Sequence, residues 1–252
     1  YGNDSVYSRT DFYDDVSLYR QGSSGMTLLH DPQIVSPHTG AITSVDVNSD
    51  YYSCTGRFML VGSSDCTISV YDLSRLGSEY HDTYIDNDNN QDGFRVGESR
   101  KRARRKPVAQ SRRLHASSLD VERVEAGTYA GLKGHRHGVV SVQWYPVDTG
   151  MFISVENNGI VHLWDTNEFC IVESFRAQAQ VANRGALHGE AVGIQSAVLP
   201  RNVNSSHMLI ACGCGNEGKV KLCDITSGSF THELIGHSVS ESINSLAWSP
   251  AD

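Results

Sequence analysis

Two groups of residues have types and spacings that could support chemistry. Residues 213–219 read Gly-Cys-Gly-Asn-Glu-Gly-Lys and match the G-x-x-x-x-G-K pattern of a phosphate-binding loop. However, Val220 stands where a Ser or Thr hydroxyl would bind Mg²⁺, and the following residues alternate as in a strand instead of opening a helix. Cys212 and Cys214, with Cys223 nearby, could contribute to a zinc site, which normally needs four ligands. We expect a turn between two strands and buried thiols here, and no nucleotide, metal or other cofactor.

The sequence contains no recognisable catalytic motif. Neither a G-x-S-x-G nucleophile elbow nor an H-E-x-x-H metal-binding pair occurs. The paired carboxylates Asp14 and Asp15 lie in an N-terminal stretch with little periodic pattern. We therefore predict that the protein is not an enzyme.

The patterned residues belong to a repeat. Each repeat contains a short apolar run, a turn rich in Gly, Ser or Asn, and a second alternating run that ends in an aromatic residue or Cys followed by Asp. The repeats lie at residues 58–72, 152–165 and 208–224. Histidines lead into further alternating runs at 42–47, 139–144 and 243–248. The pattern predicts strands joined by tight turns in a unit of about 40 residues.

A Gly-His start and a Trp-Asp end at this period resemble the WD-repeat signature of β-propellers, in which each unit is a four-stranded blade. The resemblance assigns a structural role within the blades to His38, Asp65, Tyr71, Asp72, His135, Trp164, Asp165, Asp224 and His237. The pattern departs from the family at Cys223, which replaces Trp, and at Asn158 and Glu217, which replace the turn Asp. We expect weaker hydrogen-bond networks in those blades.

The predicted fold is an all-β, incomplete WD-repeat propeller of about three blades plus the start of a fourth, with a long disordered insertion. We divide the chain into a tail at 1–30, a first blade at 31–76, an insertion at 77–130 and further blades at 131–252, truncated at the C-terminus. The chain starts at Tyr1 instead of Met, and we interpret it as a fragment.

Charge is distributed unevenly along the chain. The net charge is -8, yet residues 100–113 hold eight Lys or Arg and no acid. The rest of the chain therefore has 13 basic and 29 acidic residues. Because such a body repels phosphate groups, we do not expect direct contact with nucleic acid.

The insertion at 77–130 has few apolar residues and is predicted to be a disordered loop. A basic run within it is a candidate nuclear import signal, formed by Arg100, Lys101, Arg102, Arg104, Arg105 and Lys106. The alternatives are a phosphate contact and a solvated charge run that balances the acids at 79–92. We expect a nuclear protein.

Two further expectations concern compartment and membrane. No stretch approaches about 18 consecutive apolar residues, so we predict no transmembrane helix and no membrane partner. The six cysteines have no disulfide-framework spacing, which favours reduced thiols in an intracellular protein.

Several segments resemble the Cockayne syndrome A family. These segments are residues 143–152, 164–167, 220–228 and 247–250, within a similarity that covers 38–73 and 132–252. Members of that family are seven-bladed propellers that act as substrate receptors of a cullin-RING ubiquitin ligase in transcription-coupled nucleotide excision repair. The resemblance implies two kinds of partner: the adaptor of the ligase, and ubiquitination targets at stalled transcription complexes.

The adaptor contact is expected at the N-terminus. No blade has the Trp-Asp-x-Arg that adaptor-binding propellers often use, because Asn167, Ser74 and Thr226 stand at the Arg position. The family also docks through an N-terminal helix, and residues 10–21 could form one. Its candidate contact face consists of Phe12, Val16 and Tyr19. The alternative is a frayed tail.

Taken together, these features favour a non-catalytic substrate receptor of a cullin-RING ligase in transcription-coupled repair. The alternative is a WD-repeat scaffold of another nuclear complex, for RNA processing or chromatin assembly, because a fold does not determine a function.

Overall fold

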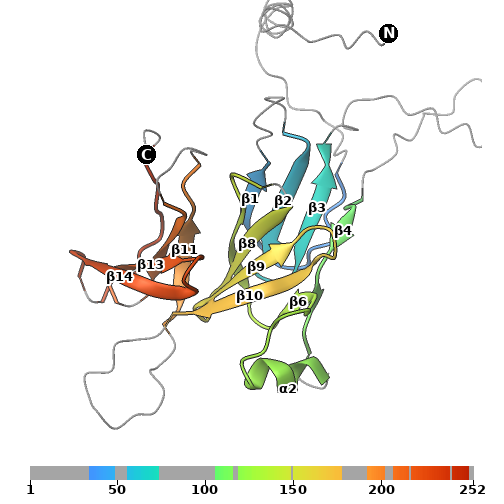
Figure 1. Cartoon of the computed structure of the whole chain (residues 1–252). Coiled ribbons are helices and arrows are strands. Elements are labelled where there is room, and N and C mark those ends of the chain that lie inside the picture. Colours follow the sequence, from blue (N-terminus) through green and yellow to red (C-terminus); the bar gives the residue numbers. More distant parts are fainter. Residues whose placement is uncertain are drawn as a thin grey trace, which may run out of the picture. The chain divides into compact units, whose positions relative to one another are not determined.

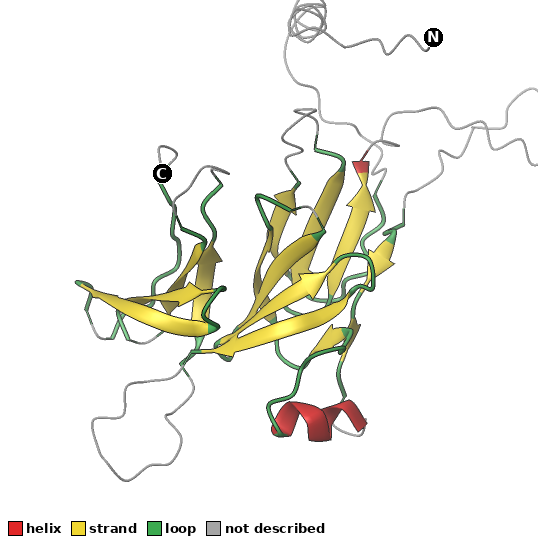
Figure 2. Cartoon of the chain, viewed as in Figure 1, coloured by secondary structure: helices red, strands yellow, loops and turns green. Residues whose placement is uncertain are grey.

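The computed structural model describes residues 34–48, 56–73, 106–115, 119–148, 150–177, 192–201, 207–215, 217–238 and 240–249. The elements that these residues form are β-strands and helix α2 (Leu119–Glu125), joined by loops and turns, as Figure 2 shows. No helix in these ranges is long and apolar enough to cross a membrane.

Three antiparallel four-stranded sheets make up the fold (Figure 1). The first consists of β1 (Ile42–Val47), β2 (Phe58–Ser63), β3 (Ile68–Asp72) and β4 (Ala109–Gln110). The second consists of β7 (Val139–Trp144), β8 (Met151–Glu156), β9 (Ile160–Asp165) and β10 (Cys170–Arg176). The third consists of β11 (Ile194–Val198), β12 (Leu209–Cys214), β13 (Lys219–Asp224) and β14 (Ser229–Ile235). Within each sheet the strands pair in chain order, as in propeller blades, and the predicted incomplete propeller is confirmed.

The turns between the second and third strands of the blades are tight. Gly159 connects β8 to β9 with a φ of +88°, and a Cβ atom there would lie 1.9 Å from the carbonyl oxygen of Val192. Only glycine combines this left-handed conformation with so close an approach. The glycine therefore fixes both the turn and its contact with the segment that enters β11.

Neighbouring blades are joined by serines at equivalent positions in their first strands. Ser44 Oγ donates to the carbonyl of Val142 (3.2 Å), and Ser141 Oγ donates to that of Ala197 (2.9 Å). The strands β1, β7 and β11 therefore follow one another in space, with β7 in contact with both of the others. The repeated contact explains why serine recurs at this place in the repeat.

A segment beyond β14 continues this arrangement. Ser196 Oγ donates to the carbonyl of Ile243 (3.0 Å), and Trp248 Nε1 donates to that of Val198 (2.9 Å). Residues 243–248 were expected to form a strand, but none is present. β1, β7 and β11 are strands because each pairs with the second strand of its own sheet, and the described residues contain no such partner for 243–248.

Two apolar cores fill the spaces between the sheets. The first contains Leu60 and Ile68 of the first sheet, packed with Phe152 and Trp164 of the second. The second core lies between the second and third sheets and includes Val155, Val161, Ile194, Ile210 and Cys212. Each sheet buries its faces against the next, which is how propeller blades become stable.

Part of the insertion differs from the prediction. Residues 106–115 and 119–130 were expected to be disordered, yet they contain β4, α2 and β5 (Arg112–Arg113), which pairs in parallel with β6 (Gly134–His135). Their few apolar side chains are placed so that they enter the first core: Leu114, Val124, Tyr129 and, just beyond, Leu132. This part of the insertion is therefore ordered because its apolar residues lie where they reach the core, although they are few. Residues 74–105 lie outside the described ranges.

Candidate functional site

The first blade is closed by a carboxylate at the β2–β3 turn. Asp65 Oδ1 accepts hydrogen bonds from Thr67 Oγ1 (2.6 Å) and Thr67 N (3.0 Å), and Asp65 Oδ2 accepts one from Thr39 N (2.8 Å). His38 Nδ1 lies 2.8 Å from Thr67 Oγ1 and 3.5 Å from Asp65 Oδ2. Tyr71 OH donates to the carbonyl of Val35 (3.1 Å). These bonds hold the segment that enters β1 against the turn.

The surroundings of Asp65 favour its charged form. Burial alone would raise the pKa of this carboxyl, but hydrogen bonds from Thr67, Thr39, Ser63 and Gly40 outweigh burial and hold the pKa well below its usual range. Asp65 is therefore an anion that stabilises the first blade.

The second blade has a different network. Trp164 Nε1 donates to Ser154 Oγ (2.8 Å), and His135 Nε2 lies 2.8 Å from the same hydroxyl. Both rings are fully buried, and their centroids are 5.1 Å apart. Asn158 replaces the turn carboxylate, and its side chain accepts a hydrogen bond from Ile160 N (3.3 Å), a residue of the same hairpin. The carboxylate in contact with the segment after His135 is Glu156 instead, since Glu156 Oε1 accepts from Arg136 N (3.1 Å).

Burial shapes the ionisation of this second network. Burial lowers the pKa of His135 to about 3, so the ring is neutral at physiological pH. Burial acts to raise the pKa of Glu156, but the neighbouring His162 and His135 and the hydrogen bond from Arg136 N lower it to about 2. The second blade therefore contains a buried carboxylate in its ionised form.

In the third blade, ion pairs between lysine and glutamate side chains take the place of the His, Asp and Trp network. Cys223 occupies the position of the tryptophan and is fully buried. Lys221 is buried in β13, and its Nζ lies 2.8 Å from Glu233 Oε1 and 4.0 Å from Glu217 Oε2. Lys219 Nζ also pairs with Glu233, at 3.1 Å. Glu217, at the position of the turn Asp, thus takes part in a lysine–glutamate cluster.

The remaining repeat residues lie at blade ends. Asp165 Oδ1 accepts from Asn167 N (2.7 Å), and Asp224 Oδ1 accepts from Thr226 N (2.9 Å), so both carboxylates cap turns. Asp72 pairs with Arg57 (3.1 Å). His237 is exposed, unlike the buried His135.

The phosphate-loop pattern at 213–219 lies at the turn between β12 and β13. Gly218 has a φ of +58°, and a Cβ atom there would lie 2.1 Å from the carbonyl oxygen of Ser238, so the packing of the turn itself requires this glycine. Burial raises the pKa of Cys214 to about 11 and that of Cys223 to about 12, and it also raises that of Cys212. These thiols are protonated, and a protonated thiol is a poor metal ligand.

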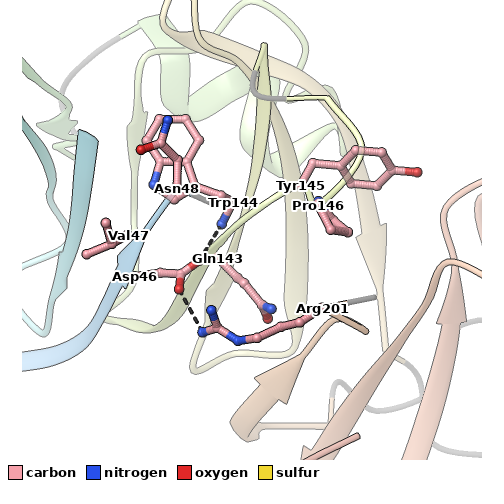
Figure 3. A pocket seen from close by; sticks show the side chains of 8 residues that line it. All are labelled: Asp46, Val47, Asn48, Gln143, Trp144, Tyr145, Pro146 and Arg201. Atoms are coloured by element: carbon pink, nitrogen blue, oxygen red, sulfur yellow. Dashed lines mark hydrogen bonds and ion pairs between the residues drawn. The ribbon is translucent and has the colours of Figure 1, made fainter. Parts of the chain in front are cut away.

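A shallow pocket lies where three blades meet at the ends of their first strands (Figure 3). Asp46 Oδ2 accepts from Trp144 N (2.8 Å), and Arg201 Nη2 donates to Asp46 Oδ1 (2.7 Å). Gln143 makes two bonds with the backbone of Leu199, at 2.7 and 3.2 Å. Asp46, Gln143 and Arg201 thus join neighbouring blades at the pocket. Its other lining residues are Val47, Asn48, Tyr145 and Pro146.

Some predicted site residues lie outside the described ranges. These are the candidate adaptor contacts Phe12, Val16 and Tyr19, and the basic residues Arg100, Lys101, Arg102, Arg104 and Arg105. Lys106, the last residue of the basic run, is described and is exposed.

Sequence reasoning missed the proximity of His135, Glu156 and His162. Within the described residues, their potential ligand atoms all lie within 4.8 Å of one another. The sequence contained part of this information. Glu156 and His162 lie on either side of a tight hairpin turn, and His162 is the cross-strand partner of Ser154. Because alternate residues of a strand point to the same face, Glu156 and His162 are expected on the face that carries Ser154 and Trp164. His135 comes from another strand, and no spacing rule connects it to this hairpin.

Comparison with known proteins agrees with the fold. The family profile described as WD domain, G-beta repeat, matches residues 31–72. WD repeat-containing protein ATCSA-1 of Arabidopsis thaliana is 28% identical over 215 residues, which are 85% of this chain and 36% of that protein. Radiation-sensitive protein 28 of Saccharomyces cerevisiae is 37% identical over 49 residues, which are 19% of this chain and 10% of that protein. The chain spans about a third or less of the length of these relatives. It is a WD-repeat protein, and its described residues form three blades of a β-propeller.

Proposed function

We propose that this chain is part of a non-catalytic substrate receptor of a cullin-RING ubiquitin ligase in transcription-coupled nucleotide excision repair, a member of the Cockayne syndrome A family. The observation that carries the proposal is the similarity to ATCSA-1, which extends over 85% of this chain. The name of the yeast relative, radiation-sensitive protein 28, agrees with a role in the response to DNA damage.

The blades are suited to holding partners without performing chemistry. The repeat residues of the first two blades bond within their own blades, as His38, Asp65 and Trp164 do. The pocket where blades meet is crossed by the Asp46–Arg201 ion pair. A rigid body of this kind acts by tethering, since holding a target beside the ligase raises its effective concentration at the site of ubiquitin transfer.

A second candidate is a scaffold of another nuclear complex, for RNA processing or chromatin assembly. The observation that favours it is the lack of Trp-Asp-x-Arg in the three blades, where Ser74, Asn167 and Thr226 stand at the Arg position. An arginine there could bind the adaptor through two parallel hydrogen bonds, which these side chains cannot replace.

Direct binding to the purified adaptor of the ligase distinguishes the two candidates. We expect the full-length protein to bind, and a triple substitution of Phe12→Ala, Val16→Ala and Tyr19→Ala to abolish binding. The matched control is Asp14→Ala, Ser17→Ala and Gln21→Ala, which changes the opposite face of the same predicted helix and should leave binding unchanged.

The other outcomes are equally informative. Binding that survives the first triple substitution would move the adaptor contact to the blades. No binding by a folded full-length protein would overturn the ligase proposal and favour the scaffold.

A further inference from the structure

Three buried side chains of the second blade leave one polar atom each without a hydrogen-bond partner. These atoms are His135 Nδ1, Glu156 Oε2 and His162 Nε2. The side chains come from β6, β8 and β9, and their relative exposures are 0%, 1% and 0%. With one ligand atom taken from each residue, the three atoms lie within 4.8 Å of one another. Since buried polar groups are almost always satisfied, three neighbouring side chains that each leave one polar atom without a partner require an explanation.

The hydrogen-bond network of the second blade does not explain these unpartnered atoms. That network uses His135 Nε2, Ser154 and Trp164, which leaves Glu156 and His162 outside it. A direct bond between those two is too long, because His162 Nε2 and Glu156 Oε1 are 3.6 Å apart.

The outer atoms of the same three groups are all held in place. Ser154 Oγ lies 2.8 Å from His135 Nε2, and Ser174 Oγ lies 2.7 Å from His162 Nδ1. Glu156 Oε1 accepts from Arg136 N at 3.1 Å. If each serine accepts the outer ring N–H, both inner nitrogens present a lone pair. Metal-binding histidines are typically oriented by a second hydrogen bond of this kind.

We propose that His135 Nδ1, Glu156 Oε2 and His162 Nε2 bind a divalent transition-metal ion, for which Zn²⁺ is the best match. Two imidazoles and one carboxylate are a common zinc donor set, and a fourth position remains for water. Tetrahedral zinc places its ligand atoms about 3.3 Å apart, so the three side chains approach one another by up to about 1.5 Å on binding.

A metal here would have a structural role. It would join the segment that enters the second blade (β6) to both strands of the central hairpin (β8 and β9). Asn158 cannot provide the carboxylate that Asp65 provides in the first blade, and the metal would replace that connection. Because the ligands converge only in the folded state, binding would be coupled to stability.

Metal titration of the complete, chelator-treated protein tests the proposal. We expect one equivalent of Co²⁺ to give visible absorption bands, one equivalent of Zn²⁺ to abolish them, and Zn²⁺ to raise the melting temperature. Glu156→Gln, which keeps the shape of the side chain, should weaken binding at least 100-fold. The matched controls Glu168→Gln and His232→Gln change exposed residues and should bind as the wild type does.

Each contrary result is decisive. The absence of saturable Co²⁺ binding to the wild-type protein would overturn the proposal, and this measurement needs no variant. Unchanged binding in a folded Glu156→Gln variant would also overturn it. So would an intense thiolate-to-cobalt absorption band, since it would assign the metal to cysteines.

Discussion

Two tryptophans of the second blade have opposite surroundings at their ring nitrogens. Trp164 Nε1 donates to Ser154 Oγ, whereas the buried Nε1 of Trp144 has no hydrogen-bond partner. Both rings contact Phe152, with ring centroids 5.4 and 5.8 Å away. The two residues thus separate the contribution of a hydrogen bond from that of ring packing.

Replacing each tryptophan by phenylalanine tests the network of the second blade. We expect Trp164→Phe to lower the free energy of unfolding by about 1 to 2 kcal/mol more than the control Trp144→Phe, because only the first removes a hydrogen bond. Denaturant unfolding measures both values. In a Ser154→Ala background the additional loss should disappear. Equal losses in the two single variants would contradict a stabilising role for this bond.

The carboxylate of Asp65 makes the first blade sensitive to acid. The pKa of Asp65 is lower in the folded protein than in the unfolded chain, where an Asp side chain titrates at about 3.9. Ionised Asp65 therefore stabilises the fold above that pH, and the contribution is lost as the pH falls further, toward the folded pKa. We expect Asp65→Asn to be less stable than the wild type at pH 7 and the difference to shrink below about pH 4. Thermal unfolding at several pH values measures this, with the exposed Glu168→Gln as control. A difference that does not change with pH would contradict the prediction.

At the level of elements, the insertion is the informative case. Its composition predicted disorder, yet Leu114, Val124 and Tyr129 are buried and pack in the first core together with Leu132, which lies just beyond the insertion. An ion pair between Arg112 and Asp120 links β5 to α2. The low apolar content of this stretch predicted disorder because composition does not show which few side chains the neighbouring sheets bury.

Truncation at Leu132 tests whether these elements stabilise the fold. We expect Leu132→Ala to cost about 2 to 4 kcal/mol of unfolding free energy, as for other buried leucines. The control is Val108→Ala, since Val108 is 60% exposed and should change stability by less than about 0.5 kcal/mol. Denaturant unfolding checks both. A neutral Leu132→Ala would contradict a stabilising role for this packing.

At the scale of the whole molecule, the first strand of the first sheet has exposed apolar side chains among the described residues. Ile42 and Val45 of β1 are 45% and 53% exposed, although equivalent positions in β7 are largely buried. In a propeller each first strand has neighbours on both sides, and β1 has β7 on one side. We expect further propeller blades to cover these residues in the complete protein.

We also propose that the protein is nuclear and that the basic run from Arg100 to Lys106 directs its import. Replacing all six basic residues of this run by glutamine should reduce the nuclear fraction of a fluorescent fusion several-fold. The control is Arg112→Gln with Arg113→Gln, which removes positive charge from the exposed residues of β5 nearby. Unchanged localisation would leave the run as a solvated charge segment, one of the alternatives that its sequence suggested.

The sequence by itself determined the strands of the three hairpins, the tight turns and the repeat, because alternation and turn chemistry are local properties of neighbouring residues. It also located most repeat residues of the first two blades, including Asp65 and Trp164. Only the tertiary structure decided which distant groups meet: Arg201 with Asp46, Leu132 with the first core, and His135 with Glu156 and His162. These contacts depend on how blades pack against one another, and packing joins residues that no spacing along the chain connects.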